Sequence, residues 1–96
     1  MNYYRWEADS KIEIHHERPS RRFVVLTLGG YWPRLLKLRD GRLMVVARDG
    51  DLHLGQRGRI VCCCSPDGGE SWSHTRVIAS EGLDNRDPAV VELSNG

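Results

Sequence analysis

The fold is decided by one stretch of the sequence, Ser65-Pro66-Asp67-Gly68-Gly69-Glu70-Ser71-Trp72. It stands between two runs rich in β-branched residues, 59–64 and 73–79, which are typical of strands. The octet therefore predicts a hairpin loop. Asp67 can accept hydrogen bonds from main-chain N–H groups two or three residues further on, and the two glycines can adopt a positive φ. We expect Asp67 to shape this turn rather than to do chemistry, and Trp72 to be buried.

Length and composition indicate one small folded domain. The chain has 96 residues, of which 40% are hydrophobic and 28% charged, and its net charge is +1. These values exclude a wholly disordered chain and allow only a thin core. The balanced charge gives no reason to expect nucleic acid or an anionic membrane as a partner. No run reaches the roughly 20 apolar residues of a membrane span.

Three adjacent cysteines, Cys62, Cys63 and Cys64, fall in a predicted strand. Successive side chains of a strand point to opposite faces, so these cysteines cannot easily bridge one another. We expect them to be reduced and buried. Together with an N-terminus that lacks the apolar core of a signal peptide, they predict a cytoplasmic chain. Neither the cysteines nor the four histidines have the spacing of metal ligands, so no metal and no cofactor is expected.

An internal repeat with an offset of 55 residues organises the strands. Residues 33–41 and 88–96 share in register a proline, two aliphatic residues, a charged residue, a leucine and an Asp-Gly or Asn-Gly turn. Between the two copies the sequence predicts four strands, which begin at Tyr31, Leu43, Arg59 and Ser73, with a hairpin turn at 39–42. Further strands are expected at 11–17, at 23–28 and from Ala89. A self-similar unit of four strands is typical of a β-propeller blade, which needs neighbouring blades to bury its faces.

The expected fold class is therefore all-β, with an antiparallel four-stranded propeller blade. Residues 1–30 are interpreted as a lead-in with outer strands, 31–87 as the first blade and 88–96 as the start of a second blade that is incomplete in this chain. We interpret the chain as the N-terminal part of a larger propeller. The alternative is a complete small subunit that assembles into a ring.

A family resemblance rests on Ser65, Asp67, Gly69 and Trp72, whose pattern Ser-x-Asp-x-Gly-x-x-Trp resembles the Asp-box (BNR repeat) of sialidases, or neuraminidases, and related β-propellers. The order of elements in residues 31–96 is also similar to that of a sialidase. A proline is followed by apolar residues, then by a strand that ends in an arginine, a loop with aspartates, and the Asp-box. The resemblance implies a six-bladed propeller and an exo-acting glycoside hydrolase that acts on terminal sugars of glycans, inactive as this fragment alone.

The same resemblance implies roles for five residues. Asp51, or Asp49 beside it, would be the catalytic acid/base, which requires a pKa raised by partial desolvation. Arg48, Arg34 and Arg86 would bind the substrate. Each residue also has a purely structural alternative. The aspartates can cap a turn in the sequence Asp-Gly-Asp, and the arginines can form surface ion pairs.

One departure from the family pattern concerns the substrate. Tyr31 stands where a sialidase places the first of its carboxylate-binding arginines, so the substrate sugar is not specified. The tyrosine nucleophile of the family, supported by a glutamate, would lie in later blades. His53 is a further candidate ligand or base. A second function, from another class, is a non-catalytic Asp-box propeller that binds glycan or protein. The expected partners are a glycan and the remaining blades.

Overall fold

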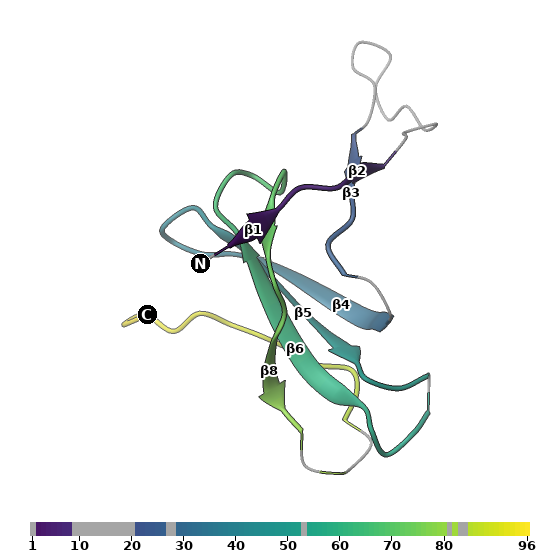
Figure 1. Cartoon of the computed structure of the whole chain (residues 1–96). Coiled ribbons are helices and arrows are strands. Elements are labelled where there is room, and N and C mark those ends of the chain that lie inside the picture. Colours follow the sequence, from purple (N-terminus) through teal and green to yellow (C-terminus); the bar gives the residue numbers. More distant parts are fainter. Residues whose placement is uncertain (1, 9–20, 27–28, 53, 81, 83–84) are drawn as a thin grey trace, which may run out of the picture.

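An antiparallel four-stranded sheet is the main element of the chain (Figure 1). The computed structural model describes residues 2–8, 21–26, 29–52, 54–80, 82 and 85–96. The sheet has the order β4-β5-β6-β8, formed by Gly29–Lys37, Leu43–Asp49, Arg59–Ser65 and Arg76–Ala79. The prediction of an all-β, antiparallel fold with four strands in one sheet is confirmed. The sheet is compatible with a propeller blade.

Two short strand pairs accompany the sheet. β1 (Tyr3–Tyr4) pairs with β7 (Trp72–Ser73), and β2 (Glu7–Ala8) pairs with β3 (Arg22–Phe23). The first pair attaches the N-terminal segment to the loop end of β6, whereas β2 and β3 lie away from the sheet (Figure 1). A helix able to cross a membrane is absent from the part of the chain that the structure describes.

Two predicted strands differ from the structure at their ends. The strand expected from Ser73 is interrupted, because His74 and Thr75 separate β7 from β8. The strand expected at 23–28 was wrong at residues 24–26, which are not in a strand, and its last two residues lie outside the described part of the chain. The Val24 N–H still donates to the Trp6 carbonyl, after which the chain leaves β2. The strand expected at 11–17 lies outside the described residues.

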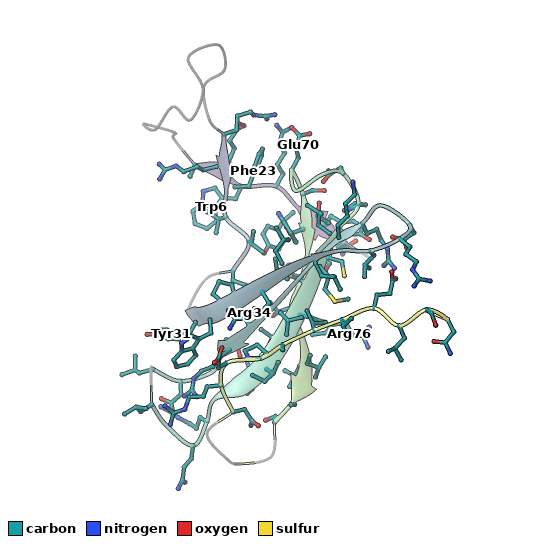
Figure 2. The ribbon with its side chains drawn as sticks, turned by 180° about the vertical axis from the view of Figure 1, so that it is seen from behind. Trp6, Phe23, Tyr31, Arg34, Glu70 and Arg76 are labelled. Carbon is teal, nitrogen blue, oxygen red and sulfur yellow. The ribbon has the colours of Figure 1, made fainter. Side chains whose placement is uncertain are left out.

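The strand predicted from Ala89 was also wrong, because residues 89–93 form no strand. This segment runs over one face of the sheet rather than beside a strand (Figure 2). Its polar groups bond to the hairpin turn at 39–42 instead of to a β-ladder. The Arg39 N–H donates to Glu92 Oε1 at 3.0 Å, and Arg39 Nη1 donates to the Ser94 carbonyl at 2.5 Å. This apolar segment is therefore extended but is not a strand, because a strand must pair with a neighbouring strand through main-chain hydrogen bonds.

The centre of the sheet is covered on both faces. Five consecutive residues of β5, 45–49, are buried, which an alternating strand achieves only when both its faces are covered. On one face, Val45, Cys63 and Trp72 form the core, against which Tyr4 and Leu26 of the N-terminal part pack. On the other face, Leu36 and Met44 line a pocket together with residues 90–93. The two terminal segments thus lie on opposite faces of the sheet.

The two copies of the sequence repeat share an uncommon backbone conformation. Among the described residues, Trp32 and Asp87 are the two non-glycine residues with positive φ, at 49° and 52°. Each one immediately precedes the proline that opens its copy, Pro33 or Pro88. The residue before a proline is normally extended, and a left-handed conformation costs an L-residue about 1–2 kcal/mol. The recurrence of this conformation after 55 residues is independent of the sequence match.

The copies also end in the same turn. The Gly41 N–H donates to the Leu38 carbonyl at 3.0 Å, and the Gly96 N–H donates to the Leu93 carbonyl at 3.0 Å. Both glycines have positive φ, at 94° and 99°, as hairpin turns of this kind require. In the first copy this turn leads from β4 into β5.

Ion pairs link the second copy, which crosses the face of the sheet, to the first copy with both running in the same direction. Arg34 Nη2 lies 2.7 Å from Asp87 Oδ1, near the start of each copy. Arg39 and Glu92 approach to 3.7 Å near the end of each copy. Contacts near both ends align the copies along their length. The proposed division into residues 1–30, 31–87 and 88–96 stays a prediction.

Candidate functional site

The loop at residues 65–72 is closed by hydrogen bonds of two side chains. Ser65 Oγ donates to Asp67 Oδ1 at 2.9 Å and accepts from the Gly69 N–H at 2.8 Å. Asp67 also accepts from the Ser71 N–H at 2.8 Å and from Ser71 Oγ at 2.5 Å. These bonds, from the Ser71 side chain first, hold the pKa of Asp67 below its ordinary value. The Asp67 carboxylate is thus fully engaged in shaping the turn.

Trp72 joins this loop to the core. Its side chain is only 4% exposed, and its Nε1–H donates to the Gly69 carbonyl at 2.8 Å. Gly68 and Gly69 have φ of 76° and 100°, which a side chain would make costly. Turn and core therefore depend on one another through the indole ring.

Arg48 lies at the end of the sheet opposite the loop at 65–72. The residue is fully buried, and its guanidinium donates to three main-chain carbonyls. Nη1 donates to Asn85 at 2.8 Å, and Nη2 donates to Leu52 at 3.0 Å and to Gly55 at 3.2 Å. A buried charge is tolerated only with such partners. Arg48 thus connects the loop after β5 with the segment before Pro88, and these carbonyls accept from both of its terminal nitrogens.

A glycine and an asparagine complete this arrangement. Gly58 is buried, and a Cβ at this position would lie 2.4 Å from Arg48 Cζ. Asn85 Nδ2 donates to the Gly58 carbonyl at 3.0 Å, so this residue contacts both Arg48 and the end of the loop. Sequence reasoning missed both residues. Little in the sequence indicates their role, because glycine and asparagine are common wherever a chain turns.

Asp49 is held by the neighbouring strand. It is 8% exposed, and Arg59 directly opposite on β6 binds it with two bonds. Arg59 Nε lies 2.9 Å from Oδ1, and Arg59 Nη2 lies 3.1 Å from Oδ2. This bidentate geometry is the strong form of a carboxylate–guanidinium pair. Asp49 is therefore a paired structural anion in this structure.

Asp51 caps the loop that follows β5. Its carboxylate accepts from the Leu52 N–H at 2.9 Å and from the Arg57 N–H at 3.2 Å. These two main-chain bonds, with the Arg57 side chain as a smaller contribution, lower the pKa of Asp51. A general acid needs the opposite shift. In this conformation Asp51 is stabilised as the anion.

An open groove brings Asp49 and Asp51 together with Arg57 and Arg59. Of the five residues proposed for catalysis and substrate binding, these two aspartates line it. Arg48 belongs to the other face of β5, since neighbouring residues of a strand point to opposite sides. The structure thus separates the candidate acid/base residues from the candidate substrate arginine beside them.

The remaining candidates lie around the second copy of the repeat. Arg34 is exposed and paired with Asp87. Arg86 is exposed. Tyr31 pairs with Arg48 across β4 and β5, so the start of β4 belongs to the same end of the sheet. His53 lies outside the described residues. Among the described residues, no group of three histidine, cysteine or acidic side chains is arranged to hold a metal ion.

Comparisons with protein-family models, curated proteins and solved structures found no match to this chain. The function of the chain is therefore inferred from its own residues.

Proposed function

We propose that the chain is a blade of a sialidase-like β-propeller and belongs to an exo-acting glycoside hydrolase that acts on terminal sugars of glycans. The observation that carries this proposal is the convergence of three segments on Arg48. They are the start of β4, the loop after β5, and the segment that opens the second copy. In a propeller, blade ends of this kind surround the central site.

The repeated conformation at Trp32 and Asp87 supports the blade interpretation. Strained backbone persists where the surrounding fold determines it, and it recurs here at equivalent places. The parallel alignment of the two copies through Arg34 and Asp87 agrees with successive blades that start at the same end. The remaining blades and a glycan are the partners that this proposal requires.

In this proposal Asp51 is the acid/base, with Asp49 as the alternative. A protonated Asp51 requires that the loop at 50–58 releases the two main-chain bonds that now lower its pKa. Substrate binding beside the groove would supply the desolvation that raises it. The chain alone is proposed to be inactive, because the nucleophile of a sialidase-type mechanism would come from other blades.

The test is hydrolysis of fluorogenic sialosides and other glycosides by the protein encoded by the complete reading frame that contains this chain. Asp51→Asn is expected to lower kcat roughly 10²–10⁴-fold, the usual contribution of a general acid. Asp40→Asn is the matched control, because Asp40 only caps an exposed turn with Arg42. Full activity in both Asp51→Asn and Asp49→Asn overturns the acid/base assignment.

A second candidate is a non-catalytic propeller that binds glycan. The lowered pKa of Asp51 favours it, since a stable carboxylate accepts hydrogen bonds from sugar hydroxyls but cannot protonate a leaving group. Binding on a glycan array with no turnover of any glycoside supports this candidate. Hydrolysis of the bound glycan rules it out.

A further inference from the structure

We infer that this chain carries a binding site for a neutral pyranose sugar in the groove between its N-terminal segment and the sheet. The groove is lined by Tyr4, Trp6, Leu26, Asp49, His74 and Thr75. It shares Asp49 and Thr75 with the groove that contains Asp51, whereas neither Arg48 nor Asp51 lines it. The inference rests on this lining and not on the proposed function. Its volume of about 280 Å³ is close to the lower limit of roughly 300 Å³ for small-molecule pockets.

The groove has one apolar wall and one polar wall. Tyr4, Trp6 and Leu26 come from the N-terminal part of the chain, whereas Asp49 and Thr75 come from the side of the sheet. A pyranose ring has the same division, because its axial C–H groups form an apolar face and its hydroxyls lie at the edge. An aromatic face attracts the polarised C–H groups, and carboxylate and hydroxyl oxygens bond to the sugar hydroxyls.

Trp6 is the exposed aromatic of this groove. Its side chain is 57% exposed, a large value for a tryptophan that has a core nearby. Its main chain is nevertheless fixed, since its carbonyl accepts from the Val24 N–H at 2.7 Å. In Figure 2 the Trp6 side chain lies beside the β2–β3 pair, on the side toward the sheet. An indole that is open to solvent and carried on a fixed main chain is suited to stack on a ligand.

Tyr4 and His74 close one end of the groove. Their ring centroids are 5.4 Å apart and tilted by 41°, so they connect the two walls. The Tyr4 hydroxyl donates to the Val25 carbonyl, which fixes its ring. Partial burial raises the pKa of Tyr4, so the phenol is neutral. This end of the groove is therefore set before a ligand arrives, which limits the entropy lost on binding.

Charge balance argues for a neutral ligand. An aromatic wall with a carboxylate would also suit an organic cation, but Arg59 binds Asp49 with two hydrogen bonds and neutralises it. The carboxylate oxygens still have lone pairs that can accept bonds from hydroxyls. A sugar uses those lone pairs without requiring net negative charge. A cationic ligand would compete with the guanidinium of Arg59.

The test is titration of the 96-residue chain with methyl hexopyranosides, followed by NMR of the indole N–H signals. The Trp6 signal is expected to shift with saturation in the millimolar range, while that of the buried Trp72 stays in place. Trp6→Ala is expected to raise Kd at least about tenfold, and Trp6→Phe less, because a ring remains. Thr75→Val, which removes a hydroxyl from the other wall, is expected to weaken binding severalfold.

Tyr3→Ala is the matched control, because Tyr3 neighbours Tyr4 on β1 and does not line the groove. Its Kd should equal that of the unchanged chain. Choline and adenosine are titrated in parallel, as a cation and as a stacking base. Saturable binding of either one at Trp6 without binding of a hexopyranoside overturns the inference. Equal affinity of Trp6→Ala and the unchanged chain for hexopyranosides also overturns it.

Discussion

The substitution Gly58→Ala tests whether the buried Arg48 guanidinium determines the residue at position 58. A Cβ there would lie 2.4 Å from Arg48 Cζ and 2.5 Å from Nη1. Carbon atoms in contact are ordinarily about 3.5–4.0 Å apart, so the guanidinium would have to move by roughly 1 Å or more. Its hydrogen bonds of 2.8–3.2 Å to three carbonyls would not survive such a shift together.

The expected cost follows from these bonds. A hydrogen bond that involves a charged group contributes about 1.5–3 kcal/mol, so losing one or two of them predicts destabilisation of about 2–5 kcal/mol. Backbone strain adds nothing, since Gly58, unlike Gly41, does not have a left-handed φ. Gly41→Ala is the matched control. It would strain a residue at φ 94° by about 1–2 kcal/mol, although its Cβ meets nothing within 4 Å.

The assay is urea unfolding of the 96-residue chain monitored by circular dichroism, with thermal unfolding as a second measurement. For a chain of this size each kcal/mol corresponds to about 4–8 °C in Tm. Gly58→Ala is expected to lower the free energy of unfolding more than Gly41→Ala does. Arg48→Met keeps an unbranched side chain but removes the guanidinium. In that background Gly58→Ala should lower the free energy of unfolding by less than about 1 kcal/mol. If its cost is the same with and without the Arg48 guanidinium, the reasoning is refuted.

Three other predictions concern pH, thiol reactivity and the core. Asp51 has a folded pKa below its ordinary value of 3.8, so its stabilising contribution is present above that pH and is lost as the pH falls through the lower, folded pKa. Asp51→Asn should therefore reduce the loss of stability between about pH 5 and pH 2, measured by unfolding at each pH. Burial raises the pKa of the Cys63 thiol to about 11, so iodoacetamide at pH 8 should label it after Cys62 and Cys64, as read by peptide mass spectrometry. Trp72→Ala should cost about 3–5 kcal/mol in urea unfolding, because the indole is 4% exposed and fills the core; a loss below 1 kcal/mol would contradict that role.

The sheet was predictable because its signals are local. Aliphatic runs on either side of an Asp-Gly turn predict β4, β5 and the hairpin between them within a short stretch of chain. The predicted strand from Ala89 has the same local signals, including the turn at Gly96. It nevertheless forms no strand, since a strand also needs a partner, and side-chain bonds to Arg39 take the place of pairing. Local pattern therefore predicts extended chain more securely than it predicts a sheet.

The candidate site was predicted less completely than the sheet. The sequence places Arg48 at the end of a strand but does not show that its guanidinium bonds to the carbonyl of Asn85, 37 residues further along. The need for glycine at position 58 follows only from that contact. Asp51 was singled out for chemistry, and the alternative of a turn cap was open as well. Its bonds to main-chain N–H groups agree with that alternative.

The hydrogen bonds that lower the pKa of Asp51 also distinguish the two proposed functions. Its low pKa is caused first by the Leu52 and Arg57 main-chain N–H groups, and only weakly by the Arg57 side chain, which is 83% exposed and 3.6 Å away. Removing that side chain would therefore not make Asp51 an acid, and a change in the main chain of the loop would be required. Arg48 holds the same loop through the carbonyls of Leu52 and Gly55. A hydrolase thus needs this loop to rearrange around a fixed Arg48, whereas a glycan-binding protein can use the loop as it stands.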